Sequence, residues 1–103
     1  VVISQVYGGG GNSGAPLRND FIELYNAGPT AISLATYSVQ YASSTGSTWN
    51  RTNLTGTLQP GQYYLVQQAA GTNTAAAALP TPDAIGTIAM SGTAGKVALV
   101  ANQ

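Results

Sequence analysis

The sequence predicts an all-β fold, a sandwich or a barrel built from about eight short strands. Three observations support this prediction. Apolar residues recur with a period of two in short runs, which is the pattern of half-buried strands. Gly, Pro and Asn interrupt these runs about every 8–12 residues, as turns do. No segment sustains the period of about 3.6 residues that a helix requires.

The first third of the chain contains two predicted strands and the loop between them. Residues 1–7 read as a strand of alternating apolar residues, and the glycine-rich residues 8–16 read as a loop. A second strand at residues 20–26 carries the run FIELYN. Its Ile22 and Leu24 fall on one face, and the aromatic and acidic residues between them fall on the other.

The middle of the chain continues this pattern of short strands and turns. The tripeptides AGP and QPG mark two of the turns, because Pro fixes φ and Gly tolerates positive φ. We expect strands at residues 30–34, 37–42, 48–52, 54–58 and 62–67.

The last third is harder to assign. We expect a long surface loop at residues 69–82, because its alanine run is too short for a stable helix. Strands at residues 86–90 and 96–101 close the fold. The strands predict a core in which six side chains bury together: Ile22, Leu24, Val39, Leu65, Val97 and Leu99.

Length and composition indicate the class of protein. A chain of 103 residues fits one domain, since domains cluster at about 100–150 residues. Only 6% of the residues are charged, against about 25% in typical globular proteins. Ser, Thr, Asn and Gln must therefore provide solubility, a balance typical of extracellular β-domains. We expect a single mature domain over residues 1–103, excised from a larger protein and located outside the cell or on its surface.

The same composition excludes several functions. Three Lys and Arg residues against three Asp and Glu residues cannot form the basic surface that binds nucleic acid or an anionic membrane. No apolar run approaches the ~20 residues of a membrane-spanning helix. Cys and His are absent, which removes thiol chemistry and the usual base that activates a serine. We therefore expect no enzyme and assign no catalytic residue.

Several motifs together resemble a known family. SQVY with the glycine loop after it opens the chain, FIELYN and LQPGQYYLV follow, and TAGKVALV lies near its end. This combination resembles the lamin tail domain, most closely its bacterial members, over nearly the whole chain. The resemblance implies an immunoglobulin-like β-sandwich of about 7–9 short strands. It also implies an accessory domain that sits beside catalytic domains in large secreted or surface proteins.

One motif departs from the family pattern. The family commonly has Leu-x-Gly-Trp where this chain has Leu34, Ala35, Thr36 and Tyr37. Tyr37 can fill the aromatic position in the core. Thr36 replaces a glycine, so it must avoid the positive φ that glycine tolerates.

Two groups of residues are candidates for binding. The glycine loop lacks the Lys-Ser or Lys-Thr pair of a phosphate-binding loop. The alternatives are a ligand-binding loop, a flexible connection between the sheets, or a place where another backbone approaches closely. Asp20 and Asp83, with loop carbonyls, are the candidate ligands for calcium. The alternative for Asp20 is a structural tie to backbone amides. The loop residues in question are Gly8, Gly9, Gly10, Gly11 and Asn12.

Two further candidates have structural alternatives. Asp20 and Glu23 are three residues apart on a strand, so they point to opposite faces and do not form a catalytic pair. Trp49 is the candidate for stacking against a sugar, and its alternative is packing in the core or at its rim. Exposure of Trp49, or of two coplanar tyrosines, would favour the sugar.

We therefore expect a non-catalytic accessory or binding domain that positions or attaches a larger secreted or surface protein through its loops. The first alternative is a carbohydrate-binding module, and the second is a structural domain stabilised by calcium. The partner is an unknown protein or glycan, and neither nucleic acid nor a membrane is expected to bind. We expect no cofactor other than calcium, and a monomeric state for the isolated domain.

Overall fold

The computed structural model describes residues 1–8, 10, 17–70, 82–91 and 95–101. This part of the chain contains no helix. Its strands are β1 (Val2–Tyr7), β2 (Asn19–Tyr25), β3 (Ile32–Ser33), β4 (Ser38–Ala42), β5 (Asn50–Asn53), β6 (Thr57–Leu58), β7 (Tyr63–Ala70), β8 (Ala84–Ile85) and β9 (Lys96–Val100).

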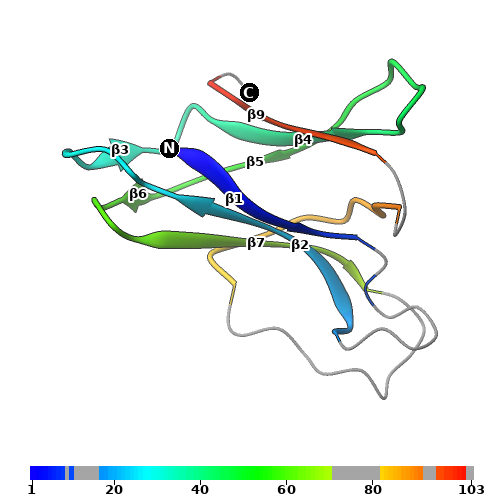
Figure 1. Cartoon of the computed structure of the whole chain (residues 1–103), viewed down its shortest axis with the longest axis horizontal. Coiled ribbons are helices and arrows are strands. Elements are labelled where there is room, and N and C mark those ends of the chain that lie inside the picture. Colours follow the sequence, from blue (N-terminus) through cyan, green and yellow to red (C-terminus); the bar gives the residue numbers. More distant parts are fainter. Residues whose placement is uncertain (9, 11–16, 71–81, 92–94, 102–103) are drawn as a thin grey trace.

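The strands form two packed layers. One sheet has the order β1-β2-β7-β8, the other has the order β5-β4-β9, and β3 pairs with β6 in a short ladder. All pairs are antiparallel except β7 with β8. Figure 1 shows β4, β5 and β9 as one layer over β1, β2 and β7. The fold is the immunoglobulin-like β-sandwich that the resemblance implies.

β2 is an inner strand of the larger sheet, and its sequence explains why. It pairs with β1 on one side and β7 on the other, with Ile22 opposite Val66 and Leu24 opposite Tyr64. All four side chains are buried. The predicted alternation along FIELYN is therefore confirmed, because one face of β2 turns fully into the sandwich.

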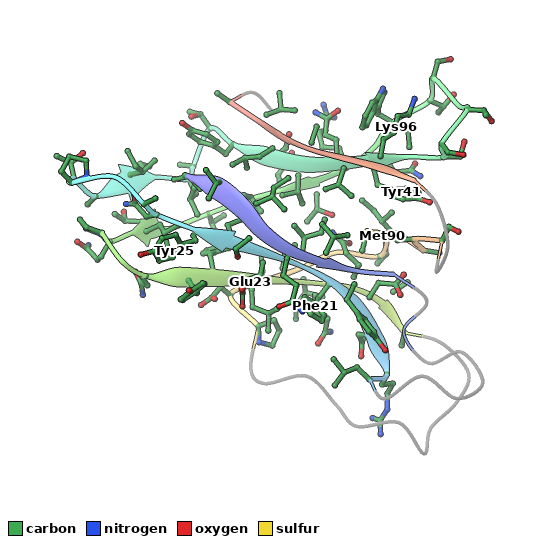
Figure 2. The ribbon with its side chains drawn as sticks, viewed as in Figure 1. Phe21, Glu23, Tyr25, Tyr41, Met90 and Lys96 are labelled. Atoms are coloured by element: carbon green, nitrogen blue, oxygen red, sulfur yellow. The ribbon has the colours of Figure 1, made fainter. Side chains whose placement is uncertain are left out.

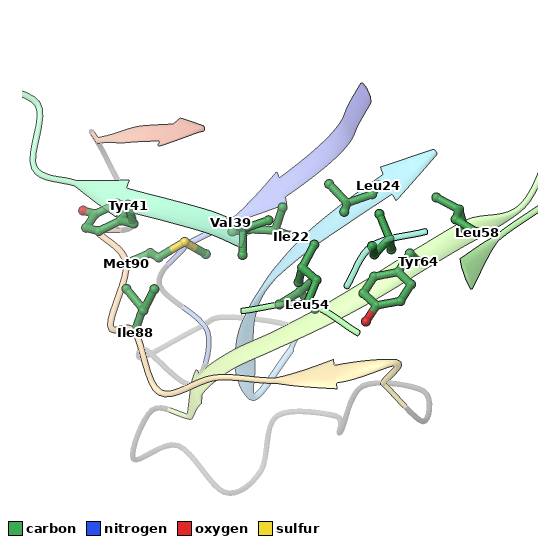
Figure 3. Close-up of a cluster of buried hydrophobic side chains, with 11 residues drawn as sticks. Ile22, Leu24, Val39, Tyr41, Leu54, Leu58, Tyr64, Ile88 and Met90 are labelled. Carbon is green, nitrogen blue, oxygen red and sulfur yellow. The ribbon is translucent and has the colours of Figure 1, made fainter. Parts of the chain in front are cut away.

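The core lies between the two sheets (Figure 3). Ile22, Leu24 and Val39 are fully buried in it, as predicted. Val97 and Leu99 are partly buried and pack against the same cluster. Its buried members are Ile22, Leu24, Leu34, Val39, Tyr41, Leu54, Leu58, Tyr64, Val66, Ile88 and Met90.

The core prediction is wrong for Leu65. This side chain is only half-buried and stands opposite Glu23 on the outer face of the sheet. The inward positions of β7 are Tyr64, Val66 and Gln68, all buried. β7 begins with four consecutive apolar or aromatic residues. Both its odd-numbered and its even-numbered positions could therefore form an apolar face. The register with β2 determines which face turns inward.

The predicted strand at residues 86–90 is also wrong. Residues 86–90 form no strand; the short strand β8 (Ala84–Ile85) ends just before them and pairs with β7 in parallel. Residues 86–90 are held mainly by irregular bonds. The Ile88 amide donates to Oε1 of Gln68 at 3.2 Å, and the Ile88 carbonyl accepts from the Ala69 amide at 3.0 Å. The Gln68 side chain thus accepts a hydrogen bond that a neighbouring strand would accept in a regular ladder. The alternation of apolar residues along the sequence does not reveal such a partner.

Other boundaries differ by a few residues. β7 runs on to Ala70, so it takes the first residues of the predicted loop, and residues 71–81 lie outside the described part of the chain. The turn before Tyr37 closes through its amide, which donates to the Leu34 carbonyl at 2.9 Å. No described residue other than glycine has a positive φ, so Thr36 fits this turn without strain.

Candidate functional site

Asp20 connects three distant parts of the chain. It lies near the start of β2 and is only 4% exposed. Its Oδ1 accepts a hydrogen bond from the Gly10 amide at 2.6 Å, and its Oδ2 accepts one from the Met90 amide at 2.7 Å. A carboxylate that accepts two backbone N–H groups is well satisfied without a cation. Asp20 therefore fastens the glycine loop and the segment before β9 to β2.

The described glycines of the first loop lie where backbones approach closely. A Cβ atom on Gly8 would overlap the carbonyl of Ser91, and one on Gly10 would overlap the backbone of Asn19. Neighbouring backbone cannot move aside as a flexible side chain would, so these two positions require glycine. Three further candidates lie outside the described residues: Gly9, Gly11 and Asn12.

Asp83 lies at the edge of β7, on the side of β8. Its Oδ2 accepts a hydrogen bond from the Leu65 amide at 2.8 Å, and its own amide donates to the Leu65 carbonyl at 2.8 Å. Asp20 and Asp83 thus bind different backbone groups. Among the described residues, no group of three or more Asp, Glu, His or Cys side chains is placed to hold a metal ion. The calcium site stays a prediction.

Glu23 lies on the outer face of the larger sheet, away from the core. The single proton of the Ser4 hydroxyl is shared between Oε1 of Glu23 at 2.9 Å and the Glu23 carbonyl at 3.1 Å. Figure 2 shows Glu23 between Phe21 and Tyr25 along β2. Asp20 is buried whereas Glu23 is half-buried on the outer face, so the two carboxylates do not work across one substrate.

Trp49 lies at the surface, just before β5, and the residue is 41% exposed. The Lys96 ammonium lies 5.4 Å from the centroid of its ring, within the range of a cation–π interaction. The same ammonium donates to the Gly46 carbonyl at 2.7 Å. Lys96 therefore joins the start of β9 to the turn between β4 and β5, and it occupies one face of the Trp49 ring.

Comparison with known proteins identifies the family of this sandwich. A family model described as the Lamin Tail Domain matches residues 1–103, the whole chain. The chain belongs to the lamin tail domain family. Members of this family are immunoglobulin-like and generally serve as non-catalytic interaction domains. No curated protein and no solved structure matches the chain.

This lamin tail domain also exposes an aromatic pair that sequence reasoning did not select. Tyr25 and Tyr63 face each other across β2 and β7 with ring centroids 4.7 Å apart. Tyr63 is 57% exposed, more than Trp49. Strand alternation already places Tyr25 on the outer face, but its neighbour depends on cross-strand register, which the sequence does not show. In the part of this lamin tail domain that the structure describes, no helix has the length and hydropathy to cross a bilayer.

Proposed function

We propose that this lamin tail domain is a non-catalytic binding domain of a larger secreted or cell-surface protein, which it positions or attaches. The observation that supports this proposal best is that the acidic side chains are engaged in structural hydrogen bonds. The chain has three, and no His. Asp20 and Asp83 accept hydrogen bonds from backbone amides, and Glu23 accepts one from a serine hydroxyl. Each has a structural partner, and within the described ranges no base and nucleophile lie together as acid–base catalysis requires.

Composition supports the extracellular location. Only 6% of the residues are charged, and the exposed turn before Trp49 carries hydroxyl side chains instead. Binding sites on sandwiches concentrate in loops and on exposed sheet faces, which a rigid framework holds in place. Asp20 supplies such a framework for the first loop by fixing Gly10.

Deleting the domain from its parent protein tests this function. We expect the parent to keep its turnover per molecule and to lose attachment to its cell surface or substrate, measured as the bound fraction after washing. A parent in which residues 11–14 are replaced by two glycines tests whether the first loop makes the contact. Its matched control shortens the turn at residues 43–47 by the same number.

Two outcomes would overturn the proposal. In the first, the parent without the domain stays attached as before. In the second, the isolated domain turns over ester, phosphate, nucleic-acid or glycan substrates. Turnover that survives Asp20→Asn and Glu23→Gln would in addition place catalysis on residues outside the arrangement described above.

Carbohydrate binding is the second candidate function. Its support is the exposure of aromatic rings on both sheets, Trp49 on one and Tyr63 on the other. Rings buried in the core do not bind ligands, whereas exposed rings offer an apolar face to a sugar. Lys96 covers one face of Trp49, so the Trp49 ring has less surface to offer.

A further inference from the structure

Cross-strand register gathers an aromatic and apolar row on the outer face of the larger sheet. Val2 stands opposite Tyr25, and Tyr25 stands opposite Tyr63. Val2 is 51% exposed and Tyr63 is 57% exposed. The two tyrosine rings are tilted by 37°, so each uses one face on the other. Tyr63 therefore keeps much of its second face in water.

A polar row lies next to the aromatic one. Gln5 stands opposite Glu23, two residues before Tyr25 on the same strand. Residues two apart on a strand are separated by about 7 Å and share a face, a spacing close to the width of one sugar ring. The Ser4 hydroxyl holds Oε1 of Glu23 at 2.9 Å, so the carboxylate is oriented before any ligand arrives. Figure 2 shows Tyr25 and Glu23 in succession along β2.

We propose that this face binds a neutral glycan chain, which stacks on the free face of Tyr63, lies beside Tyr25 and hydrogen-bonds to Glu23 and Gln5. A pyranose ring has an apolar face of C–H groups and a rim of hydroxyls. The exposed Tyr63 ring matches that apolar face, and the carboxylate and amide oxygens accept from the hydroxyls. A few polar groups beside an aromatic surface are the usual means of orienting such a ligand.

The charge on this face of the sheet favours a neutral glycan over the other possible ligands. Glu23 is the one charged residue in these two rows. Arg51 and Lys96 belong to strands of the other sheet, and Arg18 directly precedes β2 and lies in neither row. A glycan that carries carboxylates would bring like charges together. A second copy docked through the same face would bring two Glu23 side chains into one interface without a cation. A neutral chain of sugars avoids both costs.

This inference rests on the binding role proposed above and names its ligand. The test is titration calorimetry of the isolated domain with cellohexaose, xylohexaose and mannohexaose, and with the hexamer of galacturonic acid as the charged probe. We expect at least one neutral hexasaccharide to bind. Tyr63→Ala should weaken it about tenfold through loss of the stacking surface, whereas Tyr63→Phe, which keeps the ring, should stay within about threefold.

The matched control is Trp49→Ala, which removes the exposed ring of the other sheet. It should change the affinity less than about twofold. An effect of Trp49→Ala with none of Tyr63→Ala would place the site on the other sheet and overturn the proposal. So would preference for the galacturonic acid hexamer, or a dimer that Tyr63→Ala dissociates in sedimentation velocity.

Failure of this inference differs from failure of the binding role. If no hexasaccharide binds while deletion of the domain still detaches the parent protein, the glycan proposal is wrong and the binding role stands. Tyr63 is exposed, so Tyr63→Ala should fold. An unchanged circular dichroism spectrum and thermal midpoint will separate lost binding from lost structure.

Discussion

Asp20 is a buried charged side chain that holds distant parts of the tertiary structure together. Its two oxygens accept from amides that are 10 and 70 residues away in the sequence. Both amides would otherwise be buried without a partner, at a cost of about 1–3 kcal/mol each. The carboxylate thus joins separate backbone segments by hydrogen bonds, as the ladder between two paired strands does. Asn26 acts similarly, since its side-chain amide donates to the carbonyls of Thr30 and Leu58 at 2.9 Å each.

Asp20→Ala should lower the free energy of unfolding by about 2–6 kcal/mol, because two buried amides lose their acceptor. Asp83→Ala is the control, since Asp83 is exposed and accepts one bond, and it should cost about 1 kcal/mol. Urea denaturation with and without calcium measures both. We expect the same losses in both buffers. A loss for Asp20→Ala that appears only with calcium would assign a metal to this carboxylate instead.

At the scale of the element, the alternation along β2 and β7 determines which side chains support the core. Leu24 is fully buried, whereas Leu65 is half-buried on the outer face. Leu24→Ala should therefore cost about 2–5 kcal/mol, because the core cannot fill the cavity completely. Leu65→Ala removes the same atoms from a partly wet surface and should cost about 1 kcal/mol or less.

Denaturation midpoints of the two variants, measured at equal slope, give this comparison directly. Equal losses would mean that the outer face of β7 is covered as well as its inner face is. The pair is well matched because both residues are leucines in neighbouring strands of one sheet.

An element is predictable from the sequence when residues close to one another in the chain determine it, and less so when contacts with distant strands do. FIELYN alternates cleanly, so the inward position of Ile22 and Leu24 follows from the sequence alone. β7 has apolar residues on both of its faces, so its sequence does not show that Leu65 lies on the outer one, and the prediction that Leu65 is in the core is wrong. Residues 86–90 have strand-like alternation, but their amides are held by Gln68 and Asp20 from other strands. Such partners are set by tertiary register.

The same limit applies to the candidate site. Asp20 stands out in the sequence as a carboxylate beside a glycine loop, and the structural tie was one of its two predicted roles. The partnership of Tyr25 and Tyr63 needs the pairing of β2 with β7, strands separated by a long stretch of chain. Trp49 is recognisable as a candidate from the sequence. Its contact with Lys96 is not, because the two residues are far apart in the sequence and meet only in the folded second sheet.

For the whole molecule, stability must come from closing the sandwich. The chain has no cysteine for a disulfide and few charges, so burial between the two sheets is the main favourable term. The second sheet has only three strands, and β9 forms one of its edges. β9 pairs with β4 through five registered positions, and its Val97 and Leu99 pack on the core. We therefore expect the fold to depend on β9.

A chain that ends at Gly95 should lose cooperative unfolding, because β4 loses a partner and the core loses two apolar side chains. Small domains are stable by only about 5–15 kcal/mol, so losing a whole strand removes most of that margin. A chain that ends at Ala101 keeps β9 and is the matched control. Adding a peptide of residues 95–103 to the shorter chain should restore the transition, measured by circular dichroism and by amide exchange in β4. If the shorter chain unfolds cooperatively without the peptide, β2 and β7 hold the core with β4 and β5 alone.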